Sequence, residues 1–209
     1  MNDFSLIETM RWEPEIGIVR LRLHLARLKR SAGRLGFPGA EKAEEALAAV
    51  RGESSPLRVR LTLSPIGEIA VTTAPFFPLP DNTVWRVAIA KARLDSTDKL
   101  LRHKTTRRDL YEAARREYPA DIADEVLLLN EMGEPCEGTI TSIFLDDGSG
   151  QLKTPPISCG LLAGVLRTEL ICARRARAQR LSLDDVKAGT LYMGNSLRGL
   201  IRAQLITGD

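Results

Sequence analysis

The 209-residue chain has few of the residues that build several common kinds of site. Its three cysteines, Cys136, Cys159 and Cys172, show no CxxC spacing, and two histidines are too few to complete a recognisable zinc site with them. The sequence therefore predicts free thiols in a reducing compartment, with no disulfide and no metal site.

Long apolar runs and a strong net charge are also missing. No stretch approaches the roughly 20 apolar residues of a membrane span, and the start MNDFSLIETM lacks the basic residues and apolar run of a signal peptide. The net charge is only +3, with basic residues scattered among acidic ones, as is typical of solvated helix faces. We expect a cytoplasmic protein with no nucleic-acid partner and no membrane partner.

Several catalytic motifs are absent from the sequence, namely the GxxxxGK[ST] phosphate loop, the GxGxxG turn and the GxSxG elbow. Neither His24 nor His103 has a convincing triad partner, and His24 lies near the apolar stripe of the first predicted helix, where packing is favoured over catalysis. Only seven of the 30 basic residues are lysines, which leaves 23 arginines. A lysine with a special role therefore has few competitors.

What is present is the composition of a globular protein, with 44% hydrophobic and 27% charged residues. Leucines at helical spacing predict a helix over 18–35, ended by Gly36, and an alanine-rich stretch predicts a shorter helix over 41–50. Alternating residues predict paired strands at 57–63 and 69–73. The first unit is therefore expected to be a small α+β layer.

Three prolines within 75–80 exclude a continuous helix or central strand there. We therefore place a linker at about 75–83, between a small N-terminal domain (1–80) and a larger C-terminal domain (84–209). In the second domain we expect helices at about 107–118 and 161–180, and strands at 85–90, 125–130, 139–145 and near Leu191.

Five segments carry a stronger signal when they are read in order. They are IVRLRLHLARLKRSAGRLG from Ile18, LLRHKTTRRDLYEAAR from Leu100, LNEMGEPCEGTITSIFL from Leu129, LKTPPISCGLLAGVLRTELI from Leu152, and GNSLRG from Gly194. In this order they resemble the class IV (fold-type IV) pyridoxal-phosphate-dependent aminotransferase family over nearly the whole chain. The resemblance implies an α+β, two-domain fold like that of D-amino-acid aminotransferases. Its small N-terminal domain would be an α/β sandwich, and its larger cofactor-binding domain would be α/β and barrel-like.

The resemblance also implies roles for two residues in the cofactor chemistry. Lys104, in HKTTRR, matches the lysine that forms a Schiff base with pyridoxal 5'-phosphate, with Arg102 and His103 helping to lower its pKa. Glu137 matches the glutamate that keeps the pyridine nitrogen protonated. By spacing alone, Lys104 resembles a surface lysine at a helix start and Glu137 a turn residue.

The phosphate contacts implied by the resemblance come from three places. Val165 and Leu166 would offer backbone amides at a helix start, and Arg27 would offer its planar guanidinium. Ser196 would add its hydroxyl and Leu197 a further amide. From its helical position, Arg27 is equally compatible with a cleft and with solvent.

Four further residues concern the pocket. The family commonly has threonine where this chain has Leu166, and asparagine where it has Ser142, which shifts the expected contacts towards backbone groups and Ser196. Tyr111 and Thr139 are possible pocket residues, and core packing is the alternative for Tyr111.

Within the family, the sequence motifs IETMRW, HKTTRR and NSLRG resemble those of aminodeoxychorismate lyase more than those of branched-chain aminotransferases. Such an enzyme eliminates pyruvate from 4-amino-4-deoxychorismate to give 4-aminobenzoate for folate biosynthesis, with Lys104 as both base and acid. One alternative is a branched-chain or D-amino-acid aminotransferase. Another is a cofactor-binding protein that has lost catalysis. The expected partners are a small-molecule amine substrate and a second copy of the chain, as a homodimer.

Overall fold

The computed structural model describes residues 3–206, and the chain divides into two compact units. Unit 1 is the chain up to Pro78 together with His103–Arg107 and Ser196–Arg198. Unit 2 is Leu79–Arg102, Arg108–Asn195 and the chain from Gly199 onward. Two short segments that lie beyond Pro78, one near the middle of the sequence and one near its end, therefore belong to unit 1.

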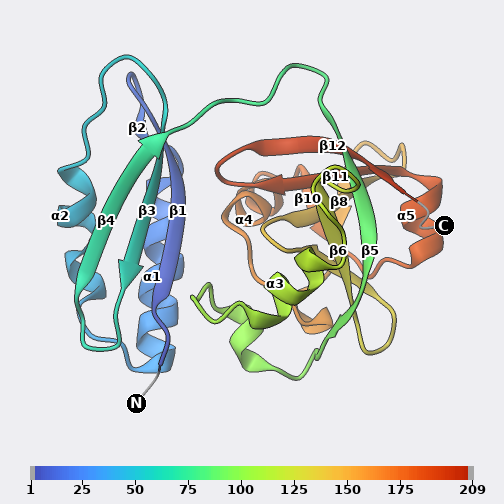
Figure 1. Ribbon diagram of the computed structural model, residues 1–209, viewed down its shortest axis with the longest axis horizontal. Coiled ribbons are helices and arrows are strands. Elements are labelled where there is room, and N and C mark those ends of the chain that lie inside the picture. The colour runs from blue at the N-terminus through green and yellow to red at the C-terminus, as the bar shows by residue number, and fades with distance from the viewer. Residues whose placement is uncertain (1–2, 207–209) are drawn as a thin grey trace. The chain divides into compact units, whose positions relative to one another are not determined.

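Unit 1 contains a four-stranded antiparallel sheet in the order β2-β1-β3-β4 (Figure 1). Strand β3 buries one face of the sheet, because Val59, Leu61 and Leu63 are buried while the alternating residues Arg58 and Arg60 are exposed. The strands are β1 (Leu6–Glu13), β2 (Gly17–Ile18), β3 (Leu57–Leu63) and β4 (Ile69–Pro75).

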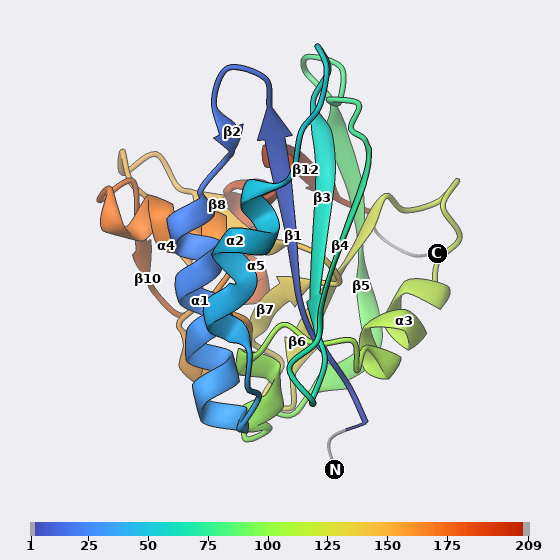
Figure 2. The ribbon, with the colours of Figure 1, turned by 90° about the vertical axis from the view of Figure 1, so that its left-hand side faces the viewer.

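Two helices lie on one face of this sheet, α1 (Leu21–Leu35) and α2 (Ala43–Ala48), which follows the short 3-10 helix η1 (Ala40–Lys42) (Figures 1 and 2). Gly36 ends α1 in the left-handed conformation, with φ of 73°, and its amide donates to the carbonyl of Ala32. The predictions of two helices and two paired strands in this region are confirmed.

Unit 2 contains an eight-stranded mixed sheet in the order β10-β9-β8-β11-β12-β5-β6-β7. A further pairing of β7 with β8 joins the end of this order back to its middle, so six of the strands form a closed circuit. The strands are β5 (Val84–Leu94), β6 (Glu125–Asn130), β7 (Pro135–Gly138), β8 (Ser142–Asp146), β9 (Leu152–Thr154), β10 (Ala176–Ala178), β11 (Thr190–Asn195) and β12 (Gly199–Leu205).

The neighbouring strands β5 and β6 are parallel, and every residue of β6 is buried, on both faces of the sheet. Val87 and Leu127 belong to one apolar cluster, while Ala88 and Leu128, each one residue further on, belong to another. Burial on both faces explains why β6 has an uninterrupted apolar run rather than alternation.

Three α-helices accompany the sheet of unit 2: α3 (Asp109–Arg116) packs on β5 and β6, α4 (Val165–Cys172) on β10 and β11, and α5 (Leu183–Ala188) on β11. The 3-10 helices η2 (Lys99–Arg102) and η3 (Ile157–Cys159) are single turns. No helix within residues 3–206 is long and apolar enough to cross a membrane. All three cysteines are free thiols, as expected.

The prediction of one helix over 161–180 is wrong. Helix α4 begins only at Val165 and ends at Cys172, and Arg174 then adopts a left-handed conformation with φ of 56°. The following residues, Ala176–Ala178, form β10 and pair in parallel with β9. Sheet pairing therefore overrides the local helical pattern.

The predicted strand over 139–145 is also shorter than expected. It begins at Ser142, because the amide of Gly138 donates to the carbonyl of Thr141 over 2.8 Å and turns the chain back on itself. Glu137, which by spacing alone resembled a turn residue, lies within strand β7.

Two glycines of unit 1 test whether a left-handed backbone conformation and a close backbone contact require glycine. A Cβ at Gly39, where φ is +84°, would lie 2.5 Å from the carbonyl oxygen of Gly67. We expect Gly39→Ala to lower the free energy of unfolding by about 2 kcal/mol or more, because a left-handed alanine costs about 1–2 kcal/mol before the clash is added. Urea denaturation followed by circular dichroism measures the change.

Gly33 is the matched control, because it is exposed in α1 and a Cβ there meets nothing within 4 Å. Gly33→Ala should raise the free energy of unfolding by about 0.5–1 kcal/mol through helix propensity. Equal effects of the two substitutions on the free energy of unfolding would contradict the requirement for glycine at position 39.

Candidate functional site

Unit 1 contains a buried polar cluster formed by Glu8, His24, Arg27 and Ser196, which are at most 8% exposed. Glu8 shares the inward face of β1 with Leu6 and Met10, since side chains alternate along a strand. His24 and Arg27 lie three residues apart on the buried side of α1. Ser196 comes from the turn between β11 and β12.

The carboxylate of Glu8 organises this cluster. Arg27 donates from Nε to Oε1 over 2.8 Å and from Nη2 to Oε2 over 2.5 Å, a two-point ion pair. The same Oε2 lies 2.6 Å from Nδ1 of His24. The other ring nitrogen of His24, Nε2, lies 2.8 Å from the Ser196 hydroxyl oxygen.

The charges in this cluster follow from its burial and its partners. Burial alone raises the pKa of Glu8, but Arg27 and His24 outweigh it and bring the pKa to about 2. Burial lowers the pKa of His24, and the positive charges of Arg27 and Arg20 add to this, against the opposing effect of Glu8. At neutral pH the cluster therefore combines a carboxylate, a guanidinium and a neutral imidazole.

The structure agrees with the expectation that His24 is packed in the interior, and it adds polar contacts that the sequence did not indicate. The ring is buried, but both of its nitrogens are within hydrogen-bonding distance of polar side chains. Arg27 is also buried, which decides between the cleft and solvent alternatives against solvent.

Lys104 also belongs to unit 1 and is half-buried. Its backbone carbonyl accepts from the amide of Ile7 over 2.9 Å, and Thr105 forms a bridge with Leu6, so this segment is tied to the start of β1. Nδ1 of the preceding His103 lies 2.9 Å from the Ser31 hydroxyl oxygen. Lys104 is therefore not at a helix start, because α3 begins only at Asp109.

Glu137, on β7 of unit 2, is buried. Its Oε1 accepts from the Tyr111 hydroxyl over 2.7 Å, and its Oε2 accepts from the Leu162 amide over 3.1 Å. Burial, with the nearby charge of Glu137, raises the pKa of Tyr111 far above its ordinary value, so Tyr111 remains a hydrogen-bond donor. The guanidinium of Arg108 lies over the Tyr111 ring, 4.9 Å from its centroid.

The loop after Glu137 is held by a second buried carboxylate, Glu125. Thr139 donates to Glu125 from its amide over 3.1 Å and from its hydroxyl over 2.6 Å. The Ile140 amide and the Thr141 hydroxyl donate over 3.2 Å and 3.1 Å. A Cβ on Gly138 would lie 2.3 Å from the Thr141 hydroxyl oxygen, so only glycine fits there.

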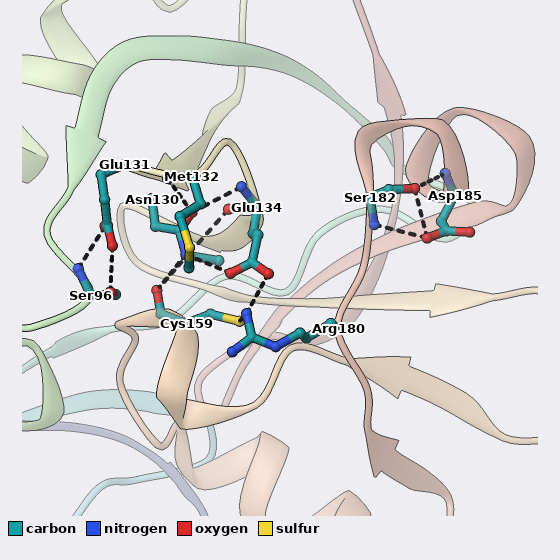
Figure 3. A network of polar contacts seen from close by, with 10 residues as sticks. Ser96, Asn130, Glu131, Met132, Glu134, Cys159, Arg180, Ser182 and Asp185 are labelled. Carbon is teal, nitrogen blue, oxygen red and sulfur yellow. Dashed lines mark hydrogen bonds and ion pairs between the residues drawn. The ribbon is translucent and has the colours of Figure 1, made fainter.

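The turn before Glu137 is held by Asn130 (Figure 3). Its Oδ1 accepts from the amides of Met132 and Glu134 over 3.1 Å and 2.9 Å, and its Nδ2 donates to the Cys159 carbonyl over 3.2 Å. Glu134 also forms an ion pair with Arg180. Fixed on both sides, Glu137 has a defined position within unit 2.

The start of α4 is built around Gly164, its N-cap residue. A Cβ there would lie 2.5 Å from the Ser142 hydroxyl oxygen. Val165 and Leu166 follow with buried side chains, and their amides have no acceptor inside the helix by geometry. Arg167 is also buried, and its Nη2 donates to the carbonyl of Pro155 over 2.8 Å.

The residues expected at the site are divided between the units. Within unit 1, Arg27 and Ser196 join the same cluster, and Leu197 is buried. Within unit 2, Tyr111 contacts Glu137 directly, while the Thr139 hydroxyl is directed at Glu125. Unit 1 holds Arg27, Lys104, Ser196 and Leu197; unit 2 holds Tyr111, Glu137, Thr139, Val165 and Leu166.

Three polar residues, Glu8, Glu125 and Arg167, were not expected from the sequence, although all are buried. A signal was present for Glu8, which interrupts an otherwise alternating apolar pattern with an acidic residue. Glu125 stands at the first position of an apolar strand, and nothing in the sequence distinguishes it from a solvated end residue.

Comparison with known proteins gives a consistent result. The family model "Amino-transferase class IV" matches residues 5–206. A relative from Schizosaccharomyces pombe named "Putative aminodeoxychorismate lyase" is 31% identical over 216 residues, covering 99% of this chain and 91% of the relative. A crystal structure of a "Putative amino-acid aminotransferase" from Mesorhizobium loti is 50% identical, with a TM-score of 0.90, covering 98% of this chain and all of the other.

A more distant structure shows the same fold. It is the "Putative 4-amino-4-deoxychorismate lyase" from Legionella pneumophila, with 21% identity and a TM-score of 0.82, covering 96% of this chain and 82% of the other. The family resemblance and the fold-type IV fold, with both helices and strands, expected from the sequence are thus confirmed. The chain belongs to the class IV aminotransferases, a family of enzymes, and has their fold.

Proposed function

We propose that the chain is a pyridoxal 5'-phosphate-dependent lyase that converts 4-amino-4-deoxychorismate into 4-aminobenzoate and pyruvate, working as a homodimer on a small-molecule amine. Support for the reaction comes from the relative in Schizosaccharomyces pombe, which matches 99% of the chain. The observation that carries the cofactor assignment is the buried carboxylate of Glu137, fixed by Tyr111 and the Leu162 amide.

The donors and acceptors on the chain fit the groups of this cofactor. A carboxylate such as Glu137 suits a protonated pyridine nitrogen, and the amine of Lys104 suits an aldehyde. A phosphate requires N–H groups and a cation. Unit 2 offers the first amides of α4, and unit 1 offers the guanidinium of Arg27.

When bound, the cofactor supplies an electron sink that stabilises negative charge on the amine-bearing carbon. Lys104 would be the residue whose Nζ takes a proton from that carbon and later returns one, as both base and acid. Glu137 would keep a proton on the pyridine nitrogen, and Tyr111 fixes the orientation of Glu137 by donating to Oε1. For the phosphate, unit 1 would offer Arg27 and Ser196, and unit 2 would offer the amides of Val165 and Leu166.

Borohydride reduction of the purified protein tests the cofactor assignment, because it fixes the cofactor covalently to the lysine that holds it. We expect peptide mass mapping to find the label on Lys104 alone among the seven lysines. Lys104→Ala should lose the label and the yellow colour, whereas Lys99→Ala should keep both. A label on another lysine, or none, would contradict the proposal.

Transamination is the second candidate, favoured by the 50% identical structure named as an amino-acid aminotransferase. The lyase should release pyruvate from 4-amino-4-deoxychorismate, measured with lactate dehydrogenase, and should form no glutamate from an amino donor with 2-oxoglutarate. The reverse pattern would identify an aminotransferase. A cofactor-loaded protein inactive in both assays would be a binding protein that has lost catalysis.

The contact between Tyr111 and Glu137 makes a separate prediction. Tyr111→Phe should lower kcat about tenfold, since a hydrogen bond to a charged group contributes about 1.5–3 kcal/mol. Steady-state kinetics with the cofactor absorbance recorded in parallel measure this change, and the cofactor should stay bound.

Tyr118→Phe is the matched control, because the Tyr118 hydroxyl donates to the Ile89 carbonyl over 3.1 Å within the same unit. This substitution should lower the free energy of unfolding by about 1 kcal/mol and leave kcat unchanged. An equal loss of kcat in both variants would show that Tyr111 acts only through general stability.

A further inference from the structure

The hydrogen-bond roles in the cluster of unit 1 can be assigned by counting donors. Glu8 is ionised at neutral pH and can only accept, so Nδ1 of His24 must carry a proton and donate to it. In a neutral imidazole, Nε2 then has no proton. Nε2 therefore accepts from the Ser196 hydroxyl, 2.8 Å away, which commits that hydroxyl proton to His24.

A phosphate dianion would change the donor and acceptor roles of Ser196 and His24, because phosphate oxygens only accept hydrogen bonds. If the Ser196 hydroxyl donates to a phosphate, it no longer donates to Nε2 of His24. Two lone pairs, on Nε2 and on the serine oxygen, would then face each other across 2.8 Å. The conflict is removed if Nε2 gains a proton and donates to the serine oxygen.

The charges of the cluster also favour the protonation of Nε2 of His24. Glu8 neutralises Arg27 through the two-point ion pair, so with neutral His24 these three residues carry no net charge. Arg20 donates from Nη1 to the backbone carbonyl of Ser196 over 3.2 Å and adds one positive charge nearby. A proton on His24 would add a second positive charge to balance a dianion.

We propose that a phosphate group binding at the Ser196 hydroxyl drives the uptake of one proton from solvent onto Nε2 of His24, which makes His24 and Glu8 positioning residues of the phosphate site. This inference rests on the proposed function, since the phosphate is that of the cofactor. No covalent bond other than the new N–H is formed, and the hydroxyl keeps its proton while its acceptor changes from nitrogen to phosphate oxygen.

The charged and hydrogen-bonding groups that face His24 are Glu8 from β1, Arg27 from α1, Arg20 before α1, and Ser196 from the β11–β12 turn. In the free protein, burial first and then the two arginines lower the pKa of His24. A bound dianion raises that pKa. Between the free and bound pKa values, affinity for the phosphate group should rise about tenfold for each unit by which pH falls.

Nuclear magnetic resonance of ¹⁵N-histidine-labelled protein tests the proposal without any substitution, since the chain has only two histidines. The probe is pyridoxamine 5'-phosphate, which lacks the aldehyde and cannot react with Lys104. At pH 8, we expect one protonated ring nitrogen on His24 in the free protein and two in the saturated complex. Binding that leaves His24 neutral would overturn this inference alone; no saturable binding would overturn the proposed function as well.

Calorimetry in two buffers of different ionisation enthalpy counts the protons taken up with the same probe. The wild type should take up about one proton more than His24→Gln, whose side chain cannot titrate. The matched control is His103→Gln, at the other histidine, which should keep the full uptake. Ser196→Ala should lose the extra proton although it retains His24. Full uptake in His24→Gln would contradict the proposal.

Discussion

The ion pair between Glu8 and Arg27 is the interaction on which the polar interior of unit 1 depends. A carboxylate on the inward face of β1 is costly unless its partners are fixed, and here a guanidinium and an imidazole from one helix meet it. Loss of one partner from a buried pair generally costs about 3–5 kcal/mol, because the other charge stays desolvated. This pair also sets the orientation of Arg27 and the tautomer of His24.

Unit 2 also contains a buried carboxylate with fixed partners, and there it holds a loop of the backbone. Its buried carboxylate Glu125 accepts four hydrogen bonds from the loop that follows Glu137, and Asn130 closes the turn that precedes it. Glu137 is therefore held by groups on both sides along the chain and by Tyr111 from α3. Because its carboxylate is already held by hydrogen bonds, Glu137 would need little reorganisation to meet a protonated nitrogen.

Much of the fold was predictable where the local pattern of apolar residues and glycines matches the burial of those residues in the structure. Strand β3 alternates, α1 ends at a glycine, and β6 is an apolar run, so each was found. Strand β1 was missed because Glu8 breaks its apolar alternation, and β10 because three residues carry too little pattern. Of the site, ordered segments indicated Lys104, Arg27 and Glu137, but Glu125 and His24 act through contacts distant in sequence, which spacing cannot show.

The hydrogen bond between His24 and Ser196 joins residues 172 positions apart. During synthesis, β1 and α1 leave the ribosome early, yet the turn that carries Ser196 emerges only after nearly all of unit 2. Segment 103–107, which pairs with the start of β1, emerges when about half of the chain has been made. Unit 1 thus completes its interior only after translation is almost finished, so the order of folding on the ribosome cannot follow the order of the chain.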